Sequence, residues 1–150
     1  MTGPLKGIRV VEFEGLGPCP FAAMTLADMG AGVVTIARAG KSQRKAKNYI
    51  WRGRHTVEMN LKDDQARADV LKMIASADIL LEGFRPGVME RLGLGPTEVH
   101  ASNQRLIYGR MTGWGQHGPL ARNAGHDINY IAITGALEAF RPRQGEPVSP

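Results

Sequence analysis

The pattern that most constrains the fold is a strand–helix–strand succession near the start of the chain. Residues 8–13 (IRVVEF) form a short run of apolar, mostly β-branched side chains, which is typical of a buried strand. Residues 21–29 have helical spacing of apolar side chains, and Gly30 suits the end of that helix. A second strand is expected over 33–37. This succession predicts two parallel strands joined by a helical crossover, and therefore an α/β fold.

The rest of the chain extends the same pattern. Three further strands are expected over 56–60, 79–81 and 106–111. Four further helices are expected, the first capped by Asp63 or Asp64, over 63–76, 86–92, 97–102 and 128–140. Loops are expected over 39–49 and 113–119, with a loop-like tail over 141–150. The order predicts an open, mostly parallel Rossmann-like sheet with flanking helices, in a single domain over residues 1–150.

Charge and cysteine content limit the class of partner. Nineteen basic residues against 14 acidic ones give a net charge of +5, which attracts polyanions. This net charge fits either a phosphorylated ligand or a basic surface that binds no specific ligand. The basic residues are scattered apart from Lys41–Lys47, so we expect no nucleic acid partner. Cys19 is the only cysteine, and no apolar run could cross a bilayer or act as a signal peptide, so we expect a cytoplasmic protein with no membrane partner.

Three segments lie where an α/β sheet binds nucleotides. Gly15-Leu16-Gly17 follows the first strand, but Pro18 and Pro20 spoil the dinucleotide-binding glycine pattern, so a tight turn is the favoured interpretation. Arg38 ends the second strand, where an arginine suits a phosphorylated ribose; a solvated charge fits equally. Met59-Asn60-Leu61-Lys62 leaves a strand and enters a helix, where backbone groups could bind adenine and Lys62 a phosphate, although an ordinary junction is favoured.

The segment Gly125-His126-Asp127-Ile128-Asn129-Tyr130 is the main catalytic candidate. It places a histidine and an aspartate at the start of an apolar helix, whose first N–H groups lack helical partners. Those groups could stabilise an enolate oxygen, while a neutral His126 could remove a proton next to a carbonyl. The alternative is that Asp127 caps the helix and His126 is a polar boundary residue. The other histidines, His55, His100 and His117, have no partner at metal-ligand spacing, and we expect no metal.

Long stretches of the chain resemble the acyl-CoA racemases of the family III CoA-transferase superfamily. The resemblance rests on GIRVVEFEGLGPCPFAAMTLADMGAGVV, on FRPGVMERLGLGP and on the segment ending in GHDINY, and it covers essentially the whole chain. It implies the N-terminal part of that family's large domain, binding coenzyme A. The implied reaction is epimerisation of 2-methyl-branched acyl-CoA thioesters by proton removal and return at C2. No cofactor is implied, because coenzyme A is part of the substrate.

The resemblance also assigns roles to residues. It makes His126 one acid/base, and it makes the Asp127 N–H part of the enolate site. Arg38 and Met59–Lys62 would contact the nucleotide of coenzyme A, Arg85 would help to hold it, and Gly125–Tyr130 would line the thioester pocket. The family's second acid/base, an aspartate after a PLNL-type segment, would follow Pro150, as would a smaller domain that closes an interlocked homodimer. We therefore expect the chain to be a fragment that does not racemise alone.

Two other functions remain open from the sequence. A CoA-transferase of the same superfamily would move coenzyme A between carboxylic acids through an aspartyl anhydride, a reaction that does not require His126. A non-catalytic CoA-binding fragment would bind the thioester without proton exchange. An NADP-dependent reductase is disfavoured by the broken glycine pattern and by the lack of a Tyr-x-x-x-Lys pair.

Overall fold

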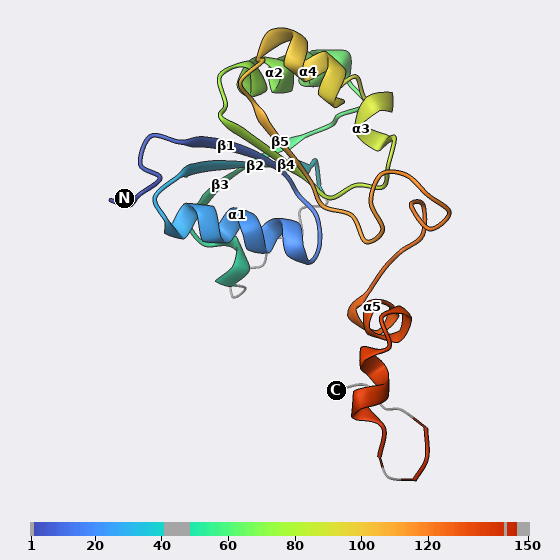
Figure 1. Ribbon diagram of the computed structural model, residues 1–150. Coiled ribbons are helices and arrows are strands. Elements are labelled where there is room, and N and C mark those ends of the chain that lie inside the picture. The colour runs from blue at the N-terminus through green and yellow to red at the C-terminus, as the bar shows by residue number, and fades with distance from the viewer. Residues whose placement is uncertain (1, 41–48, 143, 147–150) are drawn as a thin grey trace. The chain divides into compact units, whose positions relative to one another are not determined.

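The computed structural model describes residues 2–40, 49–142 and 144–146 (Figure 1). The chain divides into two compact units, the first over Met1–Met111 and the second over Thr112–Pro150. Each unit is described by itself. The expectation of a single domain over 1–150 stays a prediction.

The first unit is built on a five-stranded parallel sheet, as the sequence predicts. Its strands are β1 (Arg9–Phe13), β2 (Gly32–Arg38), β3 (Arg54–Met59), β4 (Ile79–Glu82) and β5 (Ile107–Arg110). They lie in the order β3-β2-β1-β4-β5, and every neighbouring pair is parallel. The chain runs outward from β1 to β3 and then returns to the other side of β1 at β4. This reversal creates the crevice in which open α/β sheets bind ligands, outside the carboxyl ends of β1 and β4.

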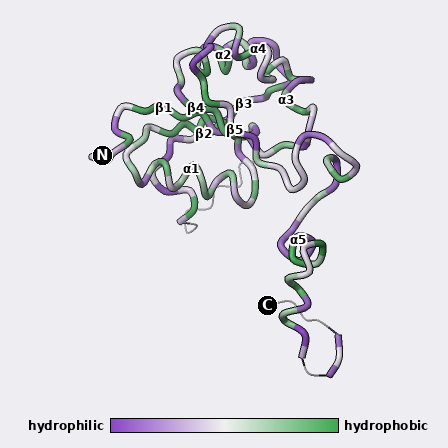
Figure 2. The backbone as a smooth tube through the Cα atoms, in the orientation of Figure 1, coloured by the Kyte–Doolittle hydropathy of each residue, from purple (hydrophilic) through white to green (hydrophobic). Residues whose placement is uncertain are grey.

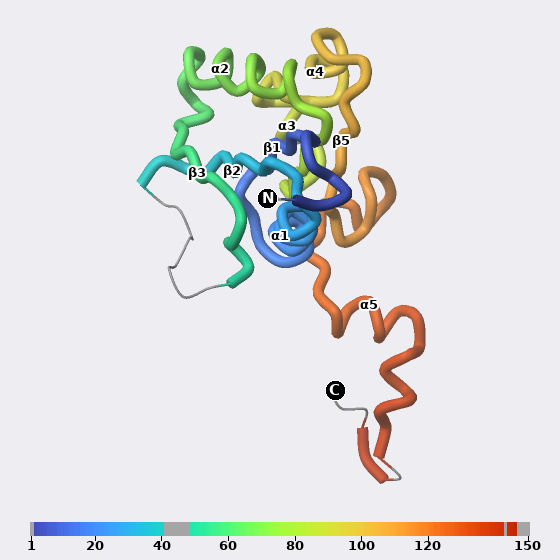
Figure 3. Tube along the Cα trace, turned by 90° about the vertical axis from the view of Figure 1, so that its left-hand side faces the viewer, coloured from blue at the N-terminus to red at the C-terminus, as the bar shows by residue number. Residues whose placement is uncertain are grey.

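Helices cover both faces of this sheet. Helix α1 (Pro18–Asp28) lies on one face, while α2 (Asp64–Ala75) and α4 (Pro96–Ser102) lie on the other, as two views at right angles show (Figures 1 and 3). Each face has its own apolar core. Val10, Val33 and Ala23 belong to the core under α1, and Phe13, Ile74 and Val99 belong to the core under α2 and α4.

Successive side chains of β1 point to opposite faces of the sheet, so this strand contributes to both cores. Residues Val10 to Phe13 are all buried, because each face of the strand meets a helix layer. The central strands are accordingly coloured as mostly hydrophobic in Figure 2. Glu12 is a charged residue among these apolar ones, and its side chain is fully buried on the α1 side. Its Oε2 accepts hydrogen bonds from Thr35 Oγ1 at 2.7 Å and from Arg54 Nη1 at 2.5 Å.

Three predicted helices begin or end elsewhere in the structure. Helix α1 begins at Pro18 rather than Phe21, because prolines are tolerated in the first turn, where N–H groups have no helical partner. Helix α3 (Val88–Arg91) begins after Gly87, whose φ of 82° is left-handed, and not at Pro86. The helix predicted over 128–140 is wrong as a single element. Gly135, with φ of 80°, separates α5 (Asp127–Ile133) from the 3-10 helix η2 (Ala136–Phe140).

Two segments predicted as loop and tail, 39–49 and 141–150, lie only partly within the described residues. Most of the loop predicted over 39–49 lies outside the described residues, and Tyr49 begins a short 3-10 helix, η1 (Tyr49–Trp51). The described part of the predicted tail, 141–142 and 144–146, contains no helix or strand, and the rest of 141–150 lies outside the described residues. Among the helices of the described ranges, none has the length and apolar character that a membrane crossing requires.

Candidate functional site

The carboxyl edge of the sheet brings together residues that lie far apart in the sequence. Phe13 ends β1, Arg38 ends β2 and Met59 ends β3, and Phe84 follows β4 by two residues. Arg38 and Met59 stand opposite each other in the parallel register of β2 and β3. The end of each strand is therefore available to line one site, at the edge where this fold class binds ligands.

A cavity of about 590 Å³ lies at this edge, within the size range of small-molecule sites. Its lining combines an apolar floor with charged groups, and it consists of Phe13, Glu14, Ile36, Ala37, Arg38, Met59, Asn60, Leu61, Lys62, Phe84 and Leu92. We call this cavity the strand-end pocket. It gathers all five of the nucleotide-site residues predicted from β2 and from the junction after β3.

The junction after β3 owes its shape to short hydrogen bonds. Asn60 Oδ1 accepts the Lys62 N–H at 3.3 Å, and the Asn60 carbonyl accepts the Asp63 N–H at 2.9 Å. Asp63 then caps α2, because its Oδ1 accepts the Ala66 N–H at 2.9 Å. These bonds turn the chain from strand to helix within a few residues. Arg38 and Lys62 are both exposed, so two cations belong to the lining of one cavity.

Two other segments predicted to contact the ligand lie outside the lining of the strand-end pocket. Arg85 is exposed and follows the lining residue Phe84 directly, but it is not itself among the described residues that line the cavity. Gly15–Gly17 forms the turn into α1, and Gly17 has a φ of 68°, which favours glycine. This is the tight strand-to-helix turn that the sequence favours. The Cys19 thiol is buried, and burial raises its pKa to about 12, so the thiolate form that a nucleophile requires is disfavoured.

The sequence did not mark six of the eleven residues that line the strand-end pocket as site residues. Phe13, Glu14 and Phe84 follow or end strands, so the rule that ligands bind at carboxyl ends of parallel strands could have found them. Phe84 packs against Phe13, with ring centroids 6.0 Å apart. Leu92 follows α3, and no local pattern marks it as a lining residue. Its place depends on how the segment between β4 and α4 folds back.

In the second unit, His126 stands at the N-terminal end of α5. It has extended backbone geometry, as an N-cap residue should, and it is exposed. Its N–H donates to Asn129 Oδ1 at 2.9 Å, and its carbonyl accepts the Asn129 N–H at 2.9 Å. Asn129 therefore fixes the direction in which the chain enters the helix. Asp127 is the first residue of the helix and not its cap, which corrects the alternative interpretation of that aspartate.

Trp114 and Tyr130 enclose Gly125, the residue before His126. Their rings meet edge to face with centroids 5.0 Å apart, and the Trp114 indole N–H donates to the Ala124 carbonyl at 3.2 Å. A Cβ atom built on Gly125 would lie 2.6 Å from Tyr130 Oη and 2.9 Å from Trp114 Nε1. Only glycine fits this close approach. The two rings therefore hold the backbone that leads to His126.

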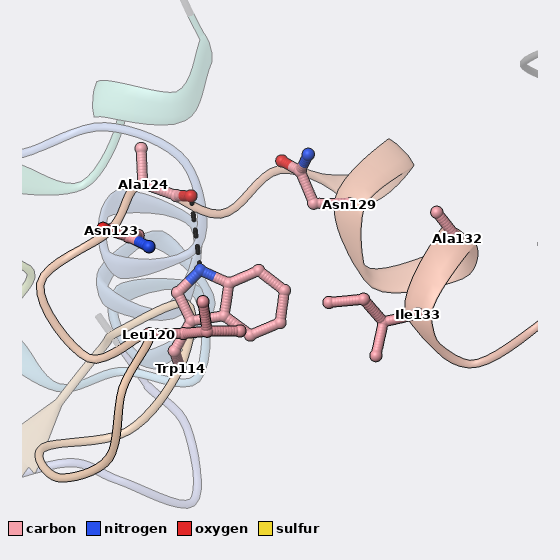
Figure 4. A pocket seen from close by; sticks show the side chains of 7 residues that line it. All are labelled: Trp114, Leu120, Asn123, Ala124, Asn129, Ala132 and Ile133. Atoms are coloured by element: carbon pink, nitrogen blue, oxygen red, sulfur yellow. Dashed lines mark hydrogen bonds between the residues drawn. The ribbon is translucent and has the colours of Figure 1, made fainter.

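A smaller cavity of about 300 Å³ lies beside these rings (Figure 4). Its lining comes from two segments of the second unit, and it consists of Trp114, Leu120, Asn123, Ala124, Asn129, Ala132 and Ile133. Figure 4 shows the indole bonded to the Ala124 carbonyl, with Ile133 of α5 facing the ring. The exposed face of α5 is apolar here, because Ile133 is 66% exposed.

Side chains that could ligate a metal do not cluster in the described part of the chain. Within 2–40, 49–142 and 144–146, no three His, Cys, Asp or Glu side chains gather as metal ligands would. His55 and His117 are exposed and His100 is half-buried.

Parallel strands in the order 3-2-1-4-5, with a cavity lined by Arg38, Lys62 and Glu14 at their carboxyl ends, define a Rossmann-like α/β protein with a candidate ligand site at the strand ends. Comparison with known proteins then gives the family. Residues 5–150 match the model of CoA-transferase family III, and the chain belongs to that family.

Similar proteins agree with this assignment. An alpha-methylacyl-CoA racemase of Mus musculus is 46% identical over 142 residues, which cover 95% of this chain and 36% of the racemase. An acetyl-CoA:oxalate CoA-transferase of Acetobacter aceti is 35% identical, over 97% of this chain and 40% of the transferase. The crystal structure of a CaiB/BaiF family protein from Brucella suis superposes with a TM-score of 0.89 at 26% identity, covering 99% of this chain and 44% of that one. The chain thus spans well under half the length of these relatives.

Proposed function

We propose that this chain supplies the coenzyme A site and one acid/base for the epimerisation of 2-methyl-branched acyl-CoA thioesters. His126 removes the proton from C2 and the thioester becomes an enolate, to which a proton then returns. No redox cofactor or metal takes part, and coenzyme A is a portion of the substrate. In this proposal a second acid/base on the opposite face of C2 completes the reaction, and the protein acts as a homodimer.

The observation that carries this proposal is the position of His126. Its imidazole is exposed at the start of α5, while its backbone is fixed by Asn129 and by the rings around Gly125. A base needs this combination of a held backbone and an accessible ring nitrogen in order to reach a substrate proton. Because α5 has only seven residues, its dipole is small, and the Asp127 N–H acts on the enolate mainly as a local hydrogen-bond donor.

The strand-end pocket supports the coenzyme A part of the proposal. Arg38 and Lys62 offer two cations to the phosphates of the nucleotide, and the apolar floor of Phe13 and Ile36 suits the flat adenine. Arg85 is exposed and follows the lining residue Phe84, and in this proposal it contacts the part of coenzyme A that leaves the pocket. Gly125–Tyr130 contacts the thioester in this proposal.

A second candidate function is CoA transfer between carboxylic acids, which the 35% identity to the Acetobacter aceti transferase favours. Product analysis separates the two functions. A protein that holds this chain together with the second acid/base is incubated with one epimer of a 2-methylacyl-CoA and an isotopically labelled free carboxylic acid. Epimerised thioester with no label on coenzyme A supports the racemase. Labelled acyl-CoA without epimerisation supports the transferase.

A non-catalytic CoA-binding role is tested separately by calorimetry with acetyl-CoA. The wild-type chain and the His126→Ala variant are expected to bind equally, because His126 acts on the acyl carbon and not on the nucleotide. Equal binding together with no C2 proton exchange in either protein would favour the binding role over catalysis.

A further inference from the structure

Glu82, the last residue of β4, is a buried carboxylate that shapes the turn after the strand. Its side chain is 2% exposed, and its Oε2 accepts the backbone N–H of Phe84 at 2.7 Å. Its Oε1 accepts Arg110 Nε at 3.1 Å. Burial raises the pKa of this carboxyl, so the ionised form is held in place only by its hydrogen-bond donors. One oxygen of Glu82 therefore holds the chain at Phe84, and the other binds Arg110.

Arg110 connects that carboxylate to helix α3. It stands opposite Glu82 in the β4–β5 register, and its Nη2 donates to Glu90 Oε1 at 2.5 Å. The guanidinium also lies over the Tyr108 ring, 5.6 Å from its centroid. The Tyr108 hydroxyl in turn donates to the Leu94 carbonyl at 3.0 Å. Strand β5 thus holds the connection from β4 to α4 at two places, Glu90 and Leu94, and it also binds the end of β4 at Glu82.

The connection held in this way forms one wall of the strand-end pocket. Phe84 and Leu92 line the pocket. The Glu82–Arg110 pair contacts this segment at the Phe84 N–H and at Glu90, which lies two residues before Leu92. The opposite wall comes from the ends of β2 and β3. A buried ion pair is seldom the most stabilising choice at such a place, because desolvation offsets much of the attraction. Such a pair can instead fix the geometry of the segment that it contacts.

We propose that Glu82, Arg110 and Glu90 form a positioning triad that holds the Phe84–Leu92 wall in the conformation that receives the nucleotide end of the thioester. The triad touches no substrate and acts through the wall. This inference rests on the proposed coenzyme A site, and it assigns the affinity of that site partly to three residues outside its lining.

The test measures binding of coenzyme A and of adenosine 3′,5′-bisphosphate by calorimetry, together with hydrogen exchange of the Phe84 amide without ligand. Arg110→Met is expected to weaken both ligands by about tenfold or more, and to speed exchange at Phe84, because both carboxylates lose their donor. Glu90→Gln, which changes only the more exposed end of the triad, is expected to fold normally and to lose less affinity. Arg110→Lys restores part of the loss.

Arg52→Met is the matched control. Arg52 makes an ion pair with Asp28 in the same unit but does not line the pocket, so its loss is expected to leave affinity and Phe84 exchange unchanged. Wild-type affinity and Phe84 exchange in Arg110→Met would overturn the triad, as would an equal loss in Arg52→Met. If wild type binds neither ligand, the proposed coenzyme A site fails, whereas the Phe84 exchange of the variants still tests whether the triad holds the wall.

Discussion

Arg38 is the residue to which we assign the ligand choice of the strand-end pocket in the proposed function. It ends β2, its side chain is exposed, and it lines the cavity together with Lys62. A guanidinium can bind a phosphate through two parallel hydrogen bonds, which a lysine cannot do. The proposed partner of Arg38 is the 3′-phosphate on the ribose of coenzyme A.

Arg38→Ala is therefore expected to remove the preference for coenzyme A over dephospho-coenzyme A. A charged hydrogen bond contributes about 1.5–3 kcal/mol, so wild type should bind coenzyme A about tenfold or more tightly than the dephospho form. Titration calorimetry with both ligands measures this ratio. Arg105→Ala is the control, because Arg105 is exposed and does not line the pocket. An unchanged ratio in Arg38→Ala would place the 3′-phosphate elsewhere.

A second prediction for a single residue concerns Gly125. In Gly125→Ala the new Cβ would lie 2.6 Å from Tyr130 Oη, so the rings or the backbone before His126 must move. We expect a cost of about 1–3 kcal/mol in the stability of the second unit, with a changed Trp114 fluorescence and loss of C2 exchange. Gly32→Ala is the matched control, since its Cβ would meet its nearest atom at 3.8 Å. Normal exchange by Gly125→Ala would show that the enclosure of Gly125 is not needed.

At the scale of helices and strands, the buried Glu12–Arg54 pair joins β1 to β3 beneath α1. Both side chains are almost fully buried, and Arg54 also lies over the Trp51 ring, 4.6 Å from its centroid. Glu12 Oε1 and Arg54 Nε have no hydrogen-bond partner among the described residues. Burial raises the pKa of Glu12, while Thr35 and Arg54 oppose the rise. The pair therefore holds η1 and β3 in place at some cost in desolvation.

Arg54→Met is expected to lower the free energy of unfolding by about 3–5 kcal/mol, because it leaves a buried carboxylate without its cation. Loss of the cation raises the Glu12 pKa further. A group whose pKa is raised in the folded state favours folding at low pH, and this contribution is lost as the pH rises through that pKa. The stability gap to wild type should therefore narrow as the pH falls toward 4.5, the ordinary glutamate value.

Denaturant unfolding across this pH range measures the effect of Arg54→Met. Glu12→Gln combined with Arg54→Met is the informative companion, because it removes the orphaned charge. The double variant should be more stable than Arg54→Met near neutral pH and should lack its pH dependence. A gap that stays constant with pH would contradict the account of Glu12.

The elements of the first unit could be predicted from the sequence better than those of the second. Buried parallel strands are apolar on both faces, so the run over 8–13 marks β1 without knowledge of its neighbours. The break between α5 and η2 was missed, because the apolar run continues through the left-handed Gly135. The sequence could place Arg38 and Met59–Lys62 at the strand ends, where they line the cavity, and their contact with coenzyme A stays a prediction. Leu92 and the Glu82–Arg110–Glu90 contacts depend on the pairing of β4 with β5, which spacing along the chain does not reveal.

At the scale of the whole molecule, the two parts of the proposed function lie in different units. The strand-end pocket is a feature of Met1–Met111, and His126 belongs to Thr112–Pro150. Variants in one part should therefore affect one measurement. Arg38→Ala is expected to change the affinity for coenzyme A, while His126→Ala changes the chemistry at C2 and leaves the affinity intact.

The account is tested most directly by exchange of the C2 proton of a 2-methylacyl-CoA for deuterium in D2O, followed by mass spectrometry or NMR. Wild type is expected to incorporate deuterium at C2, and His126→Ala is expected to lose this exchange while still binding coenzyme A. His117→Ala, which changes another exposed histidine of the same unit, is expected to exchange at the wild-type rate. Exchange by His126→Ala at the wild-type rate, or no exchange by wild type, would contradict the role assigned to His126.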